Sequence, residues 1–390
     1  MRNACIILAV VLLLLGGFTA FLVLTDGPSA AAETADTGVL LQTEPTEAPT
    51  PATTLPPEPS IEPTEAPTEE TAETEPPLPE IPEPEAEAID LGVAILVGDR
   101  AMDVPYANYA VIESYAAAVT AIAEALGPEV RTFSMAVPNA AAFYAPSASR
   151  TGNHDQMVMI DYCYSKLGDA VMPVETYRTL AEHLEEYIYF RTDHHWTQLG
   201  AYYAYVEFCA AAGFTAEPLD KFEAGQYEGF VGSMYTYLYG QAQARILLEN
   251  PDTLYYYRPF VEAKARYYSD ASLSDEGIIG VISYIEADVS NKYLTYCGGD
   301  HPIVIVRTDV EGPVCLLLKE SYGNAMIPWL TSHYSKIVVV DPREFNQEGK
   351  PSLDLRTFAE SQGANDCLIL NYPMMLNSAA YVTWLERLIQ

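Results

Sequence analysis

Residues 89–390 are predicted to fold as an α/β domain with a mostly parallel sheet, on three observations. Short apolar runs rich in Val, Ile and Leu recur along this region, as is typical of buried strands. A segment with helical apolar spacing separates the first two runs, which favours a parallel unit. The same alternation returns after residue 300. The runs cover residues 91–97, 130–137, 187–191, 303–306, 314–318, 337–341 and 367–371, and the first helical segment covers 111–126.

A change of composition interrupts this alternation at residues 215–300. The stretch is rich in Tyr and Gly, with short polar breaks between its apolar positions. It predicts an irregular, partly β insertion in the domain. Thr197 stands where it can cap a helix that runs to about residue 212, and a final helix is expected after residue 371.

The amino terminus carries an uncharged apolar stretch at residues 4–24. Its length is sufficient to span a bilayer as a helix. Arg2 precedes it and the next basic residue is Arg100, so the positive-inside rule places the rest of the chain outside the cytoplasm. We expect residues 1–25 to be a single-pass anchor in the cell membrane. The alternative is a cleaved signal peptide, after which the protein would be secreted.

A segment rich in Pro, Thr and Glu, residues 26–88, follows this stretch. It holds 16 acidic residues, 14 prolines and 11 threonines, but no Lys, Arg, Phe, Trp or Tyr. One hexapeptide occurs twice, at residues 45–50 and 63–68. Such a composition cannot bury enough apolar surface to offset the entropy of ordering the chain. It predicts a disordered and extended linker.

The formal net charge is −34, from 20 basic and 54 acidic residues. Without clustered Lys and Arg, nucleic acid is excluded as a partner, and contact with a membrane is expected through the amino-terminal helix only. A neutral glycan is compatible with this charge. Five cysteines are scattered singly beyond the apolar stretch, with no C-x-x-C spacing. Most are expected to be buried thiols, with one disulfide left open.

The string TDHHWT at residues 192–197 is the first candidate for chemistry. It follows a predicted strand, and α/β sheets place their sites in such loops. Asp193 stands two residues before His195, so its carboxylate can turn back and accept the imidazole Nδ1–H. That arrangement leaves Nε2 free as a base. Trp196 is expected to wall the site and limit the entry of water.

The string KESYGN at residues 319–324 is the second candidate. A predicted buried strand meets a turn and a helix here, which exposes the Ser321 hydroxyl near a helix N-terminus. Backbone N–H groups at such a position can stabilise an oxyanion. Gly323 permits a close approach of the backbone, and Asn324 offers a side-chain donor.

The two strings together supply an acyl-transfer triad, with Ser321 as nucleophile, His195 as base and Asp193 as the orienting residue. Taken singly, each string is also explained by a helix cap or a core hydrogen bond. A metal site at Asp193, His194 and His195 is a third interpretation. It is disfavoured because adjacent histidines seldom converge on one ion and no H-E-x-x-H motif is present. We therefore expect neither a metal nor a cofactor.

Both strings resemble the signature of the bacterial DHHW protein family. The likeness includes the Gly-Ala-Tyr that follows at 200–202, Pro328, and the Asp-Pro-Arg at 341–343. That family is similar to the SGNH-hydrolase-like domains of alginate O-acetylation proteins. Ordinary SGNH hydrolases place the Ser before the Asp and His, whereas the order here is reversed. The resemblance covers most of residues 89–390.

The resemblance implies a flavodoxin-like sheet with helices on both faces, and a catalytic triad of Asp193, His195 and Ser321. Within it, His194 is the variable position, expected to be exposed or to contact substrate. Arg343 follows a strand end. It is expected either to bind an oxygen of a ligand or to pair with one of the many acids.

Two functions remain open on the sequence. The first is an extracytoplasmic esterase or O-acyltransferase acting on O-acetyl groups of a cell-surface or cell-wall polysaccharide. If transfer prevails, analogy implies a membrane protein as acyl donor. The second is an inactive glycan-binding or assembly module on the same fold. Glu320 suggests it, because a carboxylate beside the nucleophile repels an oxyanion, and so do the 28 tyrosines.

Overall fold

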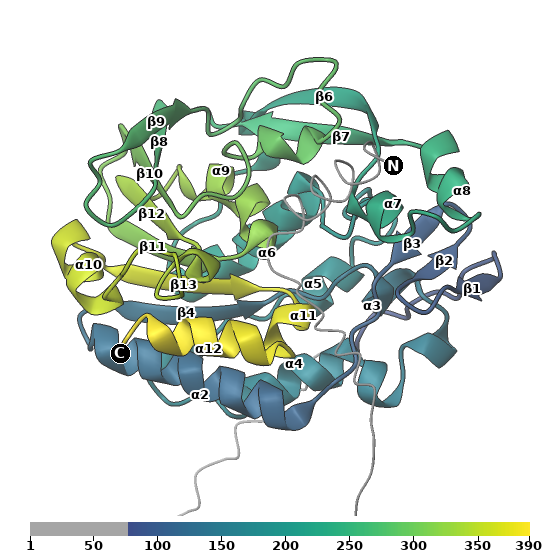
Figure 1. Ribbon diagram of the computed structural model, residues 1–390, viewed down its shortest axis with the longest axis horizontal. Coiled ribbons are helices and arrows are strands. Elements are labelled where there is room, and N and C mark those ends of the chain that lie inside the picture. The colour runs from purple at the N-terminus through teal and green to yellow at the C-terminus, as the bar shows by residue number, and fades with distance from the viewer. Residues whose placement is uncertain (1–76) are drawn as a thin grey trace, which may run out of the picture. The chain divides into compact units, whose positions relative to one another are not determined.

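The computed structural model describes residues 77–390, which form one compact unit around an eight-stranded sheet (Figure 1). The strand order is β5-β4-β13-β11-β12-β10-β8-β9. The five strands from β5 to β12 are parallel, and the pairs from β12 to β9 are antiparallel. The strands are β4 (Arg131–Ala136), β5 (Val171–Pro173), β8 (Ala263–Tyr268), β9 (Glu276–Ile279), β10 (Ile303–Thr308), β11 (Val314–Lys319), β12 (Lys336–Val340) and β13 (Asp366–Asn371).

Helices cover both faces of this sheet, which confirms the predicted fold class (Figure 1). Successive side chains of a strand point to opposite faces. In β11, Leu317 packs into one core with α6 and α9, while Leu316 and Leu318 pack into the other with α2 and α12. The helices are α2 (Tyr109–Leu126), α3 (Ala141–Tyr144), α4 (Gln156–Tyr164), α5 (Tyr177–Ala181), α6 (Gln198–Ala212), α7 (Ser233–Tyr237), α8 (Ala244–Glu249), α9 (Ile327–Leu330), α10 (Leu355–Gln362), α11 (Pro373–Leu376) and α12 (Ala379–Arg387).

Short 3₁₀ helices complete the secondary structure of the described part. They are η1 (Ser147–Ser149), η2 (Gly152–His154), η3 (Leu219–Lys221), η4 (Lys292–Thr295), η5 (Ser321–Met326) and η6 (Pro342–Glu344).

The first apolar run does not join the main sheet, so its prediction as a parallel strand is wrong. Residues 91–97 contribute only β2 (Ile95–Val97), which pairs with β1 (Ala88–Asp90) and β3 (Arg100–Met102) in a separate antiparallel sheet. Gly98, with φ +59°, turns the chain back after three extended residues. This small sheet packs its apolar side on α7 and α8. The parallel unit near the start of the domain is instead β4, α4 and β5.

Two further segments bear on the predicted organisation. Residues 187–191 form no regular strand, and only an isolated bridge joins Tyr189 to Trp196. Residues 215–300 hold α7, α8 and the two-stranded sheet of β6 (Glu223–Phe230) and β7 (Asp252–Arg258). They also supply β8 and β9, which extend the main sheet at its antiparallel end.

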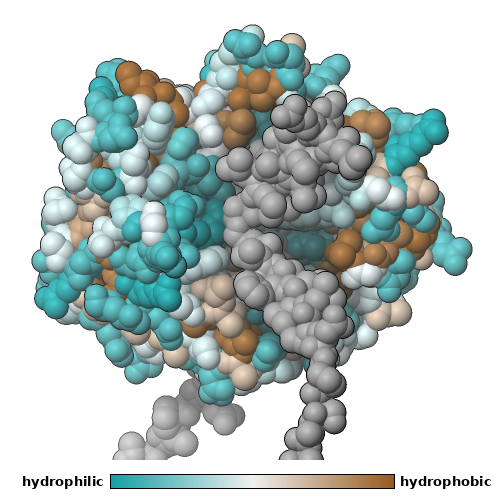
Figure 2. All heavy atoms as spheres, in the orientation of Figure 1, coloured by the Kyte–Doolittle hydropathy of each residue, from teal (hydrophilic) through white to brown (hydrophobic). Residues whose placement is uncertain are grey.

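The predicted anchor and most of the predicted linker lie outside the described residues. Within residues 77–390, α2 alone is long and apolar enough to cross a membrane. Its residues Ile112, Val119 and Ile122 are fully buried against the sheet and α12, as in a core helix. The five described cysteines are buried and unpaired, as expected for most of them. On the face drawn in Figure 2, apolar residues form separate patches among hydrophilic ones.

Candidate active site

Polar residues follow four parallel strands at their carboxyl ends, on one side of the sheet. Asn139 comes after β4, Tyr372 after β13, Ser321 after β11 and Asp341 after β12. Because parallel strands end on one side, these residues converge where α/β folds commonly bind ligands. The loop at residues 192–197 reaches the same edge, since His195 contacts Ser321 there.

The loop is held at both of its ends. At the carboxyl end of the loop, Thr197 caps α6 as predicted, and its hydroxyl accepts the Gly200 N–H at 3.2 Å. At its start, the buried carboxylate of Asp252 accepts the Thr192 N–H at 2.8 Å and the Thr192 hydroxyl at 2.6 Å. Asp252 also accepts bonds from the backbone and side chain of Arg191. The β6–β7 sheet thereby fixes the loop to the core.

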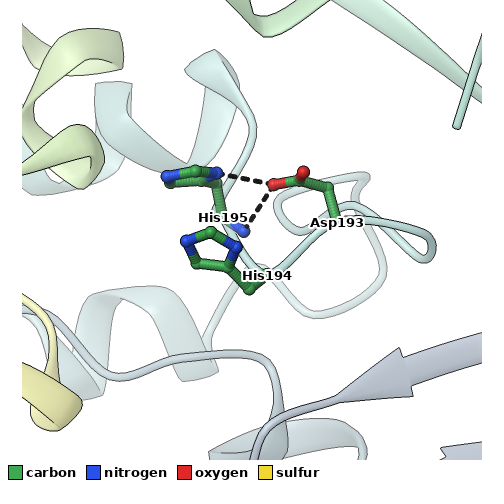
Figure 3. A group of neighbouring side chains, drawn as sticks. All are labelled: Asp193, His194 and His195. Atoms are coloured by element: carbon green, nitrogen blue, oxygen red, sulfur yellow. Dashed lines mark hydrogen bonds and ion pairs between the residues drawn. The ribbon is translucent and has the colours of Figure 1, made fainter. Parts of the chain in front are cut away.

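Asp193, His195 and Ser321 form one hydrogen-bonded series. Asp193 Oδ1 lies 2.6 Å from His195 Nδ1 and accepts the His195 backbone N–H at 2.9 Å (Figure 3). His195 Nε2 lies 2.8 Å from Ser321 Oγ. Because an ionised carboxylate only accepts, the proton belongs on Nδ1, and Nε2 is left to accept the serine hydroxyl. Asp193 and His195 are buried, whereas Ser321 is half-buried.

The second oxygen of Asp193 is held by α7. The Ser233 N–H donates to Asp193 Oδ2 at 2.7 Å. Gly232 permits this approach, since a Cβ added there would lie 2.3 Å from the Asp193 Cβ. Burial acts to raise the pKa of Asp193, but the His195 charge and hydrogen bonds hold that pKa well below its ordinary value. The carboxylate therefore stays ionised and can stabilise an imidazolium.

Aromatic rings fix the plane of the His195 imidazole. The Tyr293 ring stacks on it, with centroids 4.0 Å apart and an interplanar angle of 14°. The Tyr293 hydroxyl donates to the Ser321 carbonyl at 3.0 Å. On the same imidazole, the His194 ring approaches to a centroid distance of 3.8 Å. The imidazole thus has little freedom to turn away from the serine.

Two further hydrogen bonds join the loop to η5. Trp196 Nε1 donates to the Tyr322 carbonyl at 2.9 Å, and the Tyr322 hydroxyl donates to the His194 carbonyl at 2.8 Å. Trp196 has no exposed surface. It can therefore act on a substrate only through the residues that it holds, and it does not wall the site as expected.

Glu320 caps the helix that begins at Ser321. Its Oε2 accepts the Tyr322 N–H at 2.9 Å and lies 3.3 Å from Ser321 Oγ. Its Oε1 lies 3.4 Å from the Tyr372 nitrogen. Glu320 is only 1% exposed. Burial raises the pKa of its carboxyl, against the opposing Tyr322 hydrogen bond and the charges of Arg343 and His195.

The two expected oxyanion groups, Gly323 and Asn324, bond within the protein. The Gly323 N–H donates to the Glu320 carbonyl at 2.9 Å. Asn324 Nδ2 donates to Asp300 Oδ1 at 2.9 Å, and its Oδ1 is a buried atom without a partner in the described part of the chain. Gly323 meets the prediction of close approach, because a Cβ there would lie 2.5 Å from the Lys319 Cβ.

Arg343 is held by carboxylates. Its guanidinium donates to Asp300 at 2.7 Å and to Asp341 at 2.6 Å. Burial acts to lower the pKa of Arg343, but these two carboxylates hold that pKa well above its ordinary value. Lys319, which is fully buried, pairs with Asp300 at 2.8 Å. Of the two expectations for Arg343, the ion pair describes this structure.

His194 is half-buried, between the two expectations of an exposed residue and a ligand contact. Its Nδ1 lies 2.5 Å from the Ser233 hydroxyl. Burial lowers the pKa of His194 to about 3, with the charge of His195 acting in the same direction. The His194 ring is therefore neutral at physiological pH.

The donor atoms of Asp193, His194 and His195 lie within 4.8 Å of one another. Asp193 Oδ1 and His195 Nδ1 nevertheless face each other in a 2.6 Å hydrogen bond, so an ion between them would have to replace that bond. The donor set suits proton transfer rather than metal coordination.

Sequence reasoning missed three supporting residues, Asp252, Ser233 and Tyr293. The Gly-Ser pair at the start of α7 is a recognisable helix start, but nothing in it points to Asp193 as the partner. Asp252 stands 60 residues from Thr192. Tyr293 is one of 28 tyrosines, and most of these have no neighbouring sequence motif that would indicate their role.

Comparisons with known proteins agree with this architecture. A search of curated proteins found no match. Among solved structures, a DHHW family protein from Eubacterium siraeum is 28% identical with a TM-score of 0.68, over 78% of this chain and 99% of that one. PatB1 from Bacillus cereus is 19% identical with a TM-score of 0.57, over 76% of this chain and 98% of that one. A further PatB1 structure, with a sulfonyl adduct, is 18% identical with the same TM-score and coverage.

The family model described as DHHW protein matches residues 72–340, well over half of the chain. This range contains both the TDHHWT loop and Ser321. The parallel sheet with helices on both faces is the SGNH-hydrolase-like fold that the resemblance implies. The protein belongs to the DHHW protein family.

Proposed function

We propose that this protein is a serine-dependent O-acyltransferase or esterase that acts on acetyl groups of a cell-surface or cell-wall polysaccharide. The observation that carries the proposal is the series from Asp193 through His195 to Ser321, with atoms 2.6 and 2.8 Å apart. The same three residue types, joined in this way, activate a serine on several unrelated folds. The choice of acetyl and of a glycan rests on the family resemblance and on the excess of negative charge.

In the proposed reaction, His195 Nε2 takes the proton of Ser321 as Oγ attacks the carbonyl carbon of an acyl ester. General base catalysis of this kind contributes on the order of 10²–10⁴-fold. The tetrahedral intermediate expels the donor oxygen, which takes the proton from His195. A sugar hydroxyl or water then attacks the acyl-enzyme carbonyl and gives its proton to His195. The second tetrahedral intermediate expels Ser321 Oγ, which takes that proton back from His195. Neither a metal nor a cofactor enters these steps.

We also propose that the domain works outside the cytoplasm, held at the membrane by residues 1–25 through the linker at 26–88. Secretion after signal cleavage is the alternative arrangement. The support is the apolar stretch followed by a long segment without Lys or Arg. If transfer prevails over hydrolysis, a membrane protein that presents the acyl group is the expected partner.

The test is covalent labelling of the full-length chain, purified in mild detergent. A sulfonyl fluoride is the suitable probe, because PatB1 has been solved with a sulfonyl adduct. We expect the label on Ser321, and an initial burst of p-nitrophenol from p-nitrophenyl acetate. Ser321→Ala should lose both signals. Ser361→Ala, a change at an exposed serine, should keep both, as should the wild type after treatment with EDTA.

The competing function is a glycan-binding module without turnover. Glu320 favours it, because its oxygen lies 3.3 Å from the Ser321 hydroxyl and competes for its proton. That function predicts no burst and no label on Ser321, together with glycan binding that Ser321→Ala leaves unchanged.

A further inference from the structure

Asp103 brings an additional carboxyl group to the candidate active site from a distant part of the chain. It directly follows β3, whose Ala101 N–H donates to the Arg191 carbonyl at 2.9 Å, two residues before Asp193. The Asp103 carboxyl interacts electrostatically with both His195 and Asp193. None of the hydrogen bonds within the Asp193–His195–Ser321 series uses it. The group is near the chemistry without being part of the base.

Asn139 holds this carboxyl at the edge of the sheet. Asn139 Nδ2 donates to the Asp103 carbonyl at 2.9 Å and to its carboxylate at 3.1 Å. Asn139 is itself fully buried and fixed by Gln156, whose Nε2 donates to Asn139 Oδ1 at 2.7 Å. Asp103 remains half-buried, so part of its surface is open to solvent. A carboxylate that is held in position is suited to accepting hydrogen bonds from a ligand.

Two tyrosines lie within electrostatic range of the same carboxyl. Asp103 interacts electrostatically with Tyr237 and Tyr372. Tyr237 is 43% exposed, and its ring centroid lies 6.1 Å from that of His194. The Tyr372 ring lies 5.8 Å from His194. Met234 of α7, and Leu238 directly after this helix, pack on the β2–β3 side that leads to Asp103.

We propose that Asp103 and Tyr237 form the acceptor subsite, in which the carboxylate accepts a hydrogen bond from a hydroxyl of a neutral sugar whose ring lies on Tyr237. Aromatic faces and acceptor oxygens together are suited to a sugar, which has apolar C–H faces and a rim of hydroxyl donors. The inference rests on the proposed function, and it adds which side of Ser321 receives the acceptor and which class of sugar fits.

The charge of Asp103 selects between kinds of sugar. A uronic acid would bring its own carboxylate toward Asp103, Glu320 and Asp193, and like charges in contact disfavour binding. A neutral hexose or N-acetylhexosamine carries only donors and acceptors and meets no such repulsion. Burial raises the pKa of Asp103 to about 7, so measurements at pH 8 keep this carboxyl mostly ionised.

The test is sugar binding at pH 8 to the full-length protein carrying Ser321→Ala, so that no turnover interferes. Cellotetraose is the neutral probe and tetragalacturonate is the anionic one, each titrated by calorimetry. We expect Asp103→Asn to weaken cellotetraose binding about tenfold, the worth of one hydrogen bond to a charged group. The same change should strengthen tetragalacturonate binding. Asp90→Asn, on the exposed β1 strand, is the matched control and should change neither affinity.

Tyr237→Ala keeps the inference testable if the Asp103 variant unfolds. Loss of the ring should weaken both sugars, because stacking does not depend on the charge of the ligand. Equal affinities in the parent and Asp103→Asn proteins would overturn the inference, as would an equal weakening of both sugars. A wild type without labelling at Ser321 would refute the proposed acyl transfer alone, since the binding measurements do not require turnover.

Where turnover is present, the division of the acyl-enzyme between transfer to the sugar and hydrolysis is a further readout. A purely structural role of Asp103 would not change this division. With cellotetraose added, Asp103→Asn should lower transfer to the sugar about tenfold more than it lowers the acylation burst. Equal losses in the two steps would mean that Asp103 acts on His195 and does not contact the acceptor sugar.

Discussion

The Glu320 carboxylate accepts the backbone N–H of Tyr322 at 2.9 Å, across the Ser321 that lies between them. Backbone N–H groups beside a nucleophile are the usual donors to a tetrahedral oxyanion. In this structure the Tyr322 donor is already used by an acidic side chain. Stabilisation of an oxyanion by Tyr322 therefore requires Glu320 to withdraw or to carry a proton.

The first prediction concerns Glu320→Gln and its effect on stability as a function of pH. Burial raises the pKa of Glu320 in the folded state. The folded protein thus binds this proton more tightly than the unfolded chain, and the associated stability is fully present below the unfolded pKa. It is lost as the pH rises through the raised folded value. The glutamine has no proton to lose.

We therefore expect the stability of Glu320→Gln relative to wild type, measured by urea unfolding, to be greater at pH 8 than at pH 4. Other groups titrate alike in both proteins and cancel in the difference. Glu262→Gln is the control, since hydrogen bonding to Lys264 lowers the pKa of that exposed carboxyl, and its trend should not rise with pH. A difference independent of pH would mean that Glu320 is not perturbed.

The second prediction concerns Asp193→Asn. The amide can present its N–H to His195 Nδ1 and so favour the tautomer that carries its proton on Nε2, which cannot accept from Ser321. We expect kcat for p-nitrophenyl acetate to fall by on the order of 10³–10⁴-fold with little change in KM. Circular dichroism should remain that of the wild type. Retention of more than a tenth of the activity would contradict the assigned role of Asp193.

The third prediction concerns the lack of space beside Asp193. A Cβ at residue 232 would lie 2.4 Å from Asp193 Oδ2, so Gly232→Ala must displace the carboxylate. Small misplacements of catalytic groups cost about 10²-fold in rate, and we expect kcat to fall by that order. Ser233→Ala is the matched control. It removes the hydroxyl near His194 but keeps the N–H that donates to Asp193, so a comparable loss there would refute the steric explanation.

The fourth prediction compares two carboxylates that bind Arg191. Asp252 has a fully buried side chain and also accepts the Thr192 N–H, whereas the side chain of Asp99 is 37% exposed. Asp252→Asn should cost roughly 2–3 kcal/mol in unfolding free energy, because buried charge-assisted bonds are lost. Asp99→Asn should cost less than about 1 kcal/mol. Thermal and urea unfolding measure both losses of stability. Similar losses for the two variants would contradict the distinction between the buried Asp252 and the more exposed Asp99.

The three residues of the series were predictable because each stands in a recognisable string beside a strand or helix end. The parallel strands from β11 to β13 were predictable for a similar reason, since both of their faces are buried and their sequences are continuously apolar. Residues 91–97 have the same composition but enter an antiparallel hairpin. The local composition predicts that a strand is buried, but it does not predict which strand or helix packs against it.

The supports of the site could not be predicted in this way. Asp252 acts on Thr192, and Tyr293 acts on His195, through contacts between segments that only the tertiary fold brings together. Asp103 is the sharpest case. It lies in an unremarkable stretch after a short strand, and its carboxylate accepts a hydrogen bond from Asn139, which follows a different strand.

The strand order also determines when the site can exist. β13 lies between β4 and β11 and pairs with both. The strand that precedes Asn139 is therefore joined to the strand that precedes Ser321 only through β13. The matched family region ends at residue 340, before this strand begins. A chain released early in synthesis would hold every residue of the series and still lack the strand that joins its halves. The Asp193–His195–Ser321 series therefore depends on a strand that lies beyond all three of its residues in the sequence.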